Sequence, residues 1–137
     1  MINISANIKA PLSEIWGKWV SVEGVRHWAF ASDDWAAEGI ENNVKPGGSF
    51  KNRNFAKDGS VEFFLEGTYE DVVPQKHVSY TMGDGRKVET TFEETSDGVN
   101  MRQFFEPETE NPEKMQQAGW QAYLDNFKKY VESTNKS

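Results

Sequence analysis

The chain has 137 residues, 13% of them aromatic, and its 15 Lys and Arg residues against 22 Asp and Glu residues give a net charge of −7. A chain of this length can bury roughly two-thirds of its surface, which is enough for a single domain over residues 1–137 with one aromatic-rich core. The negative charge disfavours nucleic acid and membrane surfaces as partners, and the absence of Cys excludes disulfides, thiolate nucleophiles and Cys-ligated zinc.

The N-terminal residues MINISANIKAP lack the basic region and apolar run of a signal peptide. No stretch reaches the roughly 20 apolar residues of a membrane-spanning helix. We therefore expect a cytoplasmic protein. No cofactor is predicted, and the sequence is compatible with a monomer or a homodimer.

The first elements follow from apolar spacing. Alternate Ile residues before Pro11 predict a strand at the start of the chain. The next apolar residues recur at helical intervals, and Pro11 suits the first position of a helix. This predicts a short helix over 11–21, followed by a second short helix over Val22 to Trp28.

Turn signals divide residues 40 to 105 into strands. Three Asp-Gly pairs suit two-residue hairpin turns, and two further breaks contain Pro. Between these turns, apolar and charged residues alternate with the period of two that half-buried strands show. The segment is predicted to be an antiparallel meander with turns at Pro46-Gly47-Gly48, Asp58-Gly59, Pro74-Gln75-Lys76, Asp84-Gly85 and Asp97-Gly98.

A long helix is predicted at the C-terminal end, with Asn111 as its N-cap, Pro112 next, and an end near Ser133. Its apolar residues cover nearly half the circumference, which requires a concave partner. The fold class is therefore α+β: a helix-grip fold in which a curved antiparallel sheet of six or seven strands wraps around the long helix. The apolar residues form two adjoining lines, Met115, Gly119, Tyr123 and Tyr130 beside Trp120, Leu124, Phe127 and Val131.

Five segments together resemble a known family. They are Val25-Arg26-His27-Trp28, the stretch from Ala29 to Trp35, Pro46 to Phe50, Glu66 to Tyr69, and Gly119 to Tyr130. The chain is similar to bacterial proteins related to the C-terminal domain of the activator of the heat-shock protein 90 ATPase, within the START and birch-pollen-allergen-like superfamily. The resemblance implies a cavity between sheet and long helix that binds an apolar small molecule, and it leaves a chaperone as a partner that the sequence itself does not support.

The candidate ligand-binding residues are the side chains that could face such a cavity. Three of them, Arg53, Glu66 and Arg102, lie in strands that carry aromatic residues on both faces. For these three we expect side chains that point outward, away from the cavity. The full set is Trp28, Trp35, Arg53, Phe64, Glu66, Tyr80, Phe92, Arg102, Phe104, Gln116, Gly119, Trp120 and Tyr123.

Two residues of the long helix suit a packed core poorly. Gln116 falls between the two apolar lines, and Gly119 lies on the inner line although Gly in a helix costs about 1 kcal/mol relative to Ala. They either orient and accommodate a ligand, or Gly119 admits a bulky strand side chain while water solvates Gln116.

No catalytic residue or metal site is predicted. His27 has no recognisable nucleophile as partner, and His77 lies fifty residues away without metal-ligand spacing. Asp33 and Asp34 are expected to cap a turn rather than to act as an acid-base pair. The sequence favours a carrier or sensor with an apolar cavity, because no catalytic constellation is recognisable. The alternatives are an enzyme of the same fold with an inward carboxylate or His, and an interaction module with an exposed apolar patch.

Overall fold

The beginning of the chain forms the strand and the two short helices that its apolar spacing predicts. The computed structural model describes residues 2–30 and 32–134. The two helices separate at Ser21, whose hydroxyl accepts a hydrogen bond from the Gly24 N–H at 3.0 Å and caps the second helix. The elements are strand β1 (Ile2–Ile8), helix α1 (Leu12–Val20) and helix α2 (Val22–Trp28).

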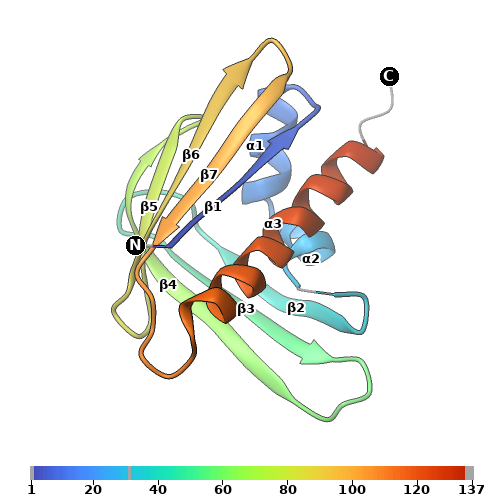
Figure 1. Ribbon diagram of the computed structural model, residues 1–137, viewed down its shortest axis with the longest axis vertical. Helices are drawn as coiled ribbons and strands as arrows, with labels where there is room; N and C mark the ends of the chain where they lie inside the picture. The colour runs from blue at the N-terminus through green and yellow to red at the C-terminus, as the bar shows by residue number, and fades with distance from the viewer. Residues whose placement is uncertain (1, 31, 135–137) are drawn as a thin grey trace.

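The meander supplies the other strands of one antiparallel sheet, and the sheet has seven strands, within the predicted six or seven. Their order is β1-β7-β6-β5-β4-β3-β2 (Figure 1). The three Asp-Gly pairs lie at hairpin turns, and their glycines adopt positive φ angles of 79°, 92° and 124°. The strands are β2 (Trp35–Asn42), β3 (Ser49–Ala56), β4 (Glu62–Val73), β5 (His77–Met82), β6 (Lys87–Thr95) and β7 (Gly98–Phe105).

The predicted start of the meander at residue 40 is wrong, because β2 already begins at Trp35. Its register with β3 shifts between Glu38 and Glu41, and Gly39 has a φ of 61°. This irregularity, together with two Ala residues, interrupts the alternation by which a strand is recognised.

The longest element is helix α3 (Glu113–Thr134), which crosses the concave side of the sheet (Figure 1). It begins one residue later than predicted: the carbonyl oxygen of Pro112 accepts the first hydrogen bonds, from the N–H groups of Met115 and Gln116 at 3.0 and 3.1 Å. Within the described part of the chain, neither α3 nor a shorter helix has the length and hydropathy of a membrane span.

The helix also covers the edge of the sheet at β1. The side-chain amides of Gln117 and Gln121 donate hydrogen bonds to the carbonyl oxygens of Asn3 and Ser5, at 2.9 and 3.0 Å. Four residues of a helix rise about 6 Å and two residues of a strand about 6.6 Å, so a helix parallel to the strand can repeat the contact. The two glutamines thus bind carbonyl groups at the edge of the sheet, to which another strand could otherwise form hydrogen bonds.

The core lies between α3 and the concave face, where alternate side chains of the strands are buried. A bulge between Tyr69 and Asp71 in β4 changes the alternation there. The ring of Phe105 stacks on Trp120 with their centroids 4.1 Å apart. The fully buried large side chains include Ile8, Ile15, Met101, Phe105, Phe127 and Val131.

Candidate functional site

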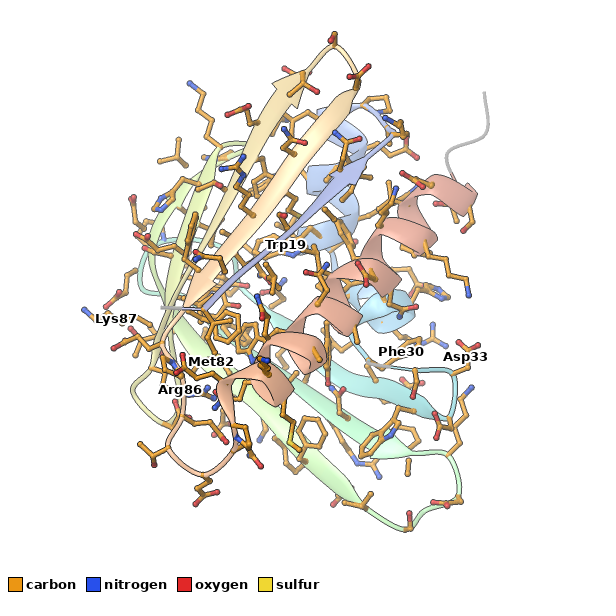
Figure 2. All side chains as sticks on the ribbon, viewed as in Figure 1. Trp19, Phe30, Asp33, Met82, Arg86 and Lys87 are labelled. Atoms are coloured by element: carbon orange, nitrogen blue, oxygen red, sulfur yellow. The ribbon has the colours of Figure 1, made fainter. Side chains whose placement is uncertain are left out.

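A cavity of about 140 Å³, here named the inner hollow, lies between the concave face of the sheet and α3. Trp19, Val25 and Trp28 of the two short helices line it, and Figure 2 shows Trp19 between the sheet and α3. Helix α3 contributes Trp120, Tyr123, Leu124 and Phe127 to the lining. The short helices thus border the space.

Among the described residues, all those that line the inner hollow are uncharged. Most are aromatic or aliphatic, so the environment is largely apolar. The polar side chains at its surface are Asn42, Asn52, Tyr69, Tyr80, Gln103 and Tyr123.

Two tyrosines in this lining hold hydrogen bonds to asparagine. The Tyr69 hydroxyl donates to Asn42 Oδ1, and the Tyr123 hydroxyl donates to Asn54 Oδ1 at 2.7 Å. Burial raises the pKa of Tyr69, an effect that the bond to Asn42 partly opposes, and burial raises the pKa of Tyr123 to about 12. Both hydroxyls are therefore neutral donors near pH 7.

Other polar atoms at the inner hollow have no protein partner among the described residues. Asn52 Oδ1 is buried without a hydrogen bond, and so is Nδ2 of Asn54, a residue outside the lining that is bonded to Tyr123 through its Oδ1. The Tyr80 side chain is only 8% exposed, and its hydroxyl makes no hydrogen bond to a described residue. Gln103 uses its Nε2 to donate to Thr90 at 3.0 Å.

A second depression of about 260 Å³, here named the outer groove, lies along the N-terminal part of α3. It shares two lining residues, Trp120 and Tyr123, with the inner hollow. Figure 2 shows Arg86 near the beginning of α3, at the border of this groove. The rest of the lining comes from Phe63, Glu108, Asn111, Met115, Gln116 and Gly119.

The structure brings four of the predicted ligand-binding residues to the inner hollow: Trp28, Tyr80, Trp120 and Tyr123. Trp28 is fixed there by a hydrogen bond from its indole N–H to the Lys18 carbonyl at 3.0 Å. Its ring also meets Phe127 edge to face. These four side chains come from three elements far apart in the sequence.

Five residues of the candidate set point away from the inner hollow. This agrees with the outward position expected for Arg53, Glu66 and Arg102, and it corrects the assignment of Phe64 and Phe104 to the lining. Because Asn54 of β3 faces α3, its neighbour Arg53 lies on the convex face, where it pairs with Glu62 at 2.6 Å. Side chains directly across from one another share a face, so the register places the remaining four there too. The five are Arg53, Phe64, Glu66, Arg102 and Phe104.

Gln116 and Gly119, the two residues of α3 that suit a packed core poorly, line the outer groove rather than the inner hollow. This also corrects their assignment. Gln116 is buried, and its amide pairs with the backbone of Glu108 and Asn111 in the connection before α3. A Cβ atom added to Gly119 would meet no heavy atom within 4 Å. Gln116 is therefore satisfied by protein groups rather than by water, and Gly119 does not admit a strand side chain.

Trp35 and Phe92 take further positions outside the lining. The Trp35 ring contacts Phe63 at 5.5 Å between centroids, at the outer end of the concave face. Phe92 is buried against Trp16 and Trp19 as part of the core. Their predicted place at the inner hollow is thus corrected as well.

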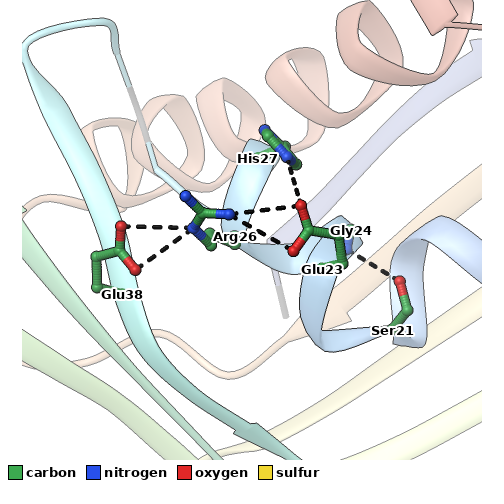
Figure 3. Close-up of polar contacts among 6 residues, drawn as sticks. All are labelled: Ser21, Glu23, Gly24, Arg26, His27 and Glu38. Carbon is green, nitrogen blue, oxygen red and sulfur yellow. Dashed lines mark hydrogen bonds and ion pairs between the residues drawn. The ribbon is translucent and has the colours of Figure 1, made fainter.

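The cluster around His27 lies at the surface (Figure 3). His27 Nε2 lies 3.0 Å from Glu23, while Arg26 bridges Glu23 and Glu38 at 3.4 Å. The His27 ring stacks on Tyr130. The arrangement is an exposed charge network that joins α2 to β2 and α3.

The remaining polar candidates are dispersed. His77 lies between Asp71 and Glu89, at 3.3 and 3.6 Å, and no three His, Asp or Glu residues in 2–30 and 32–134 gather as metal ligands. Figure 2 shows Asp33 at the periphery. The Ser32 hydroxyl donates to Asp34 and lowers the pKa of that carboxyl, consistent with the expected turn; Ala31 lies outside the described residues.

Sequence reasoning missed the asparagine wall of the inner hollow. Asn52 and Asn54 stand two residues apart in β3 and face α3, with the charged residues Lys51 and Arg53 on the other face. Asparagine is unusual at the positions of a strand that face the core, because its buried amide needs hydrogen-bond partners. The alternation of asparagine with charged residues in β3 is the signal from which these two inward asparagines could have been predicted.

Comparison with known proteins gives one family. A family model described as activator of Hsp90 ATPase homolog 1-like protein matches residues 9–132. An AHSA1-like protein from Aeromonas hydrophila, known from a solution structure, is 37% identical in sequence. The match covers 96% of this chain and 92% of that protein, with a TM-score of 0.92. A Cytophaga hutchinsonii protein is 38% identical with the same coverage and a TM-score of 0.82.

A more distantly related structure shows that the fold is shared, and nothing beyond the fold. A protein from Chromobacterium violaceum shares 19% identity over 96% of both chains, with a TM-score of 0.84. No curated protein matches the chain. The match over residues 9–132, together with the first two structures, shows that the chain belongs to the activator of Hsp90 ATPase homolog 1-like family.

Proposed function

We propose that this protein is a non-enzymatic carrier or sensor that binds a small, neutral, largely apolar molecule in the inner hollow. The observation that carries the proposal is the buried Asn52 Oδ1, which has no hydrogen-bond partner among the described residues and belongs to a largely apolar lining that also carries the Tyr80 hydroxyl. A buried polar group without a hydrogen bond costs about 1–3 kcal/mol. A ligand that donates a hydrogen bond to Asn52 Oδ1 removes this cost.

Size and charge define the ligand class. A cavity of about 150 Å³ holds a benzene ring, and the inner hollow is of this size, at about 140 Å³. The uncharged lining offers no counter-ion to a carboxylate or phosphate, and burial of an unpaired charge is costly. A single-ring molecule with one hydroxyl or amine donor fits both conditions.

The same lining favours binding over the enzymatic alternative. A hydrolase or isomerase of this fold calls for an inward carboxylate or histidine with a perturbed pKa. The lining consists instead of uncharged groups, and burial raises the pKa of Tyr80, which keeps its hydroxyl protonated near pH 7. The site therefore offers hydrogen bonds and apolar contact.

A second candidate is a protein-interaction module, as the family description suggests. The observation in its favour is that Phe63 and Met115 are 40% and 61% exposed and both line the outer groove. An increase in the ATP hydrolysis rate of a bacterial Hsp90 on addition of this protein would support this function.

The carrier proposal is tested by native mass spectrometry of protein purified from its own host, with identification of any molecule released on denaturation. Asn52→Leu removes the partnerless acceptor, whereas Arg102→Ala on the convex face is the matched control. A neutral stoichiometric adduct that is lost in Asn52→Leu and kept in Arg102→Ala supports the proposal.

Two results count against the proposal. An adduct that carries a carboxylate or phosphate contradicts the ligand class. A clean apo mass, with no thermal shift from a panel of phenols, indoles and single-ring amines, overturns the carrier function and leaves the interaction module as the better candidate.

A further inference from the structure

Building on the binding function proposed above, we propose that the outer groove is the entrance to the inner hollow and that Tyr123 is the residue that opens it. The Tyr123 ring moves aside to admit a neutral molecule and then returns to its hydrogen bond with Asn54.

The two spaces meet at a partition of two side chains. Trp120 and Tyr123 are the residues that line both the inner hollow and the outer groove. Trp120 is held by its stacked contact with the fully buried Phe105, at 4.1 Å and an interplanar angle of 16°. Tyr123 has one polar partner among the described residues, Asn54, and no ring contact of this kind. Tyr123 is therefore the more mobile part of the partition.

Gly119 provides the room for this movement. Side chains on a helix lean toward its N-terminus, so Tyr123 leans over the turn that contains Gly119, four residues earlier. A Cβ atom at position 119 would meet no heavy atom within 4 Å. The outer groove is thus open where the Tyr123 ring would swing, and any larger residue at 119 would occupy that space.

Asn54 accounts for the return of Tyr123. The side chain of Asn54 is fully buried, and its Nδ2 already lacks a partner. When Tyr123 leaves, Oδ1 loses its hydrogen bond at 2.7 Å as well. The closed position is therefore favoured, and opening is transient.

The test measures exchange of two probes between solvent and the inner hollow, xenon by ¹²⁹Xe NMR and phenol by ¹H NMR. Gly119→Leu fills the outer groove. Gly17→Leu is the matched control, because Gly17 is also an exposed helical glycine whose added Cβ would meet no heavy atom within 4 Å. We expect Gly119→Leu to lower the association and dissociation rates together by about tenfold, with an unchanged dissociation constant, since an obstructed path affects both directions equally. Gly17→Leu should keep wild-type rates.

Tyr123→Phe gives the opposite result. It keeps the ring but removes the hydrogen bond that favours the closed position, so both exchange rates should rise by about tenfold. Two variants that change the exchange rates in opposite directions cannot both be explained by a general loss of stability.

The outcomes separate this inference from the proposed function. Wild-type exchange rates in Gly119→Leu overturn the entrance while leaving the binding function intact. Weaker affinity with an unchanged association rate makes the groove part of the binding site and also overturns the entrance. Slowed xenon exchange without phenol binding supports the entrance and contradicts the ligand class. If neither probe reaches the inner hollow of the wild-type protein, the entrance proposal is wrong.

Discussion

The two halves of α3 carry the same apolar periodicity but meet different surroundings. In the C-terminal half, Leu124, Phe127 and Val131 are at most 3% exposed. In the N-terminal half, Met115 is 61% exposed, Gly119 faces open space, and Trp120 separates two cavities. One half stabilises the fold and the other leaves room beside it. The two spaces beside α3 thus lie where the helix is incompletely packed.

The largest expected effect lies in the packed half. Phe127→Ala removes a fully buried ring and should lower the free energy of unfolding by about 3–5 kcal/mol in urea titrations. Met115→Ala, in the open half, should change it by less than about 0.5 kcal/mol. Similar losses in the two variants would show that the halves do not differ in packing.

The hydrogen bond across the partition comes next. Tyr123→Phe leaves the buried Asn54 Oδ1 without a partner and should lower the free energy of unfolding by about 1–3 kcal/mol. Adding Asn54→Leu removes both partners and should restore most of the loss in the same urea titration. A double variant as unstable as the sum of its single changes would refute this account.

The partnerless Tyr80 should reveal itself at alkaline pH. Burial raises the folded-state pKa of Tyr80, so above its unfolded value of about 10 only the unfolded chain loses the proton, and stability falls by about 1.4 kcal/mol for each further pH unit. Tyr80→Phe removes this contribution. Urea midpoints at pH 8 and pH 11.5 should therefore differ less in the variant than in the wild type; an equal difference would show that Tyr80 titrates normally in the fold.

The smallest effect concerns the open half itself. Gly119→Ala and Gly17→Ala each add a methyl group in open space on a helix and should raise the free energy of unfolding by about 0.5–1 kcal/mol. Thermal unfolding is the simplest measurement. A loss of stability in Gly119→Ala alone would mean that the groove beside it is filled.

Much of the fold could be predicted because it depends on local chemistry. The Asp-Gly pairs require positive φ angles, and they define the hairpins wherever they occur. The start of β2 escaped prediction because Gly39 and the shifted register interrupt the alternation. Regular elements were thus found and an irregular one was partly missed.

The candidate site was harder to predict because it depends on which face of a strand is concave. In β3, one face carries Phe55 with Arg53 and the other carries Phe50 with Asn52, so either face could be the apolar one. Only the contact of Asn54 with Tyr123 of α3 assigns the faces. Gln116 likewise could be placed on the inner side of the helix, but its partners in the preceding connection follow from the path of that connection.

The sequence by itself determined the elements, their order, the turns that connect them and the helix-grip class, because these follow from interactions between residues close together in the chain. The tertiary structure decided which strand face lines the inner hollow, how far the packed core extends along α3, and that Trp120 and Tyr123 divide two spaces. Those features arise from the accumulated twist of seven strands and from contacts between distant residues, which no local pattern contains.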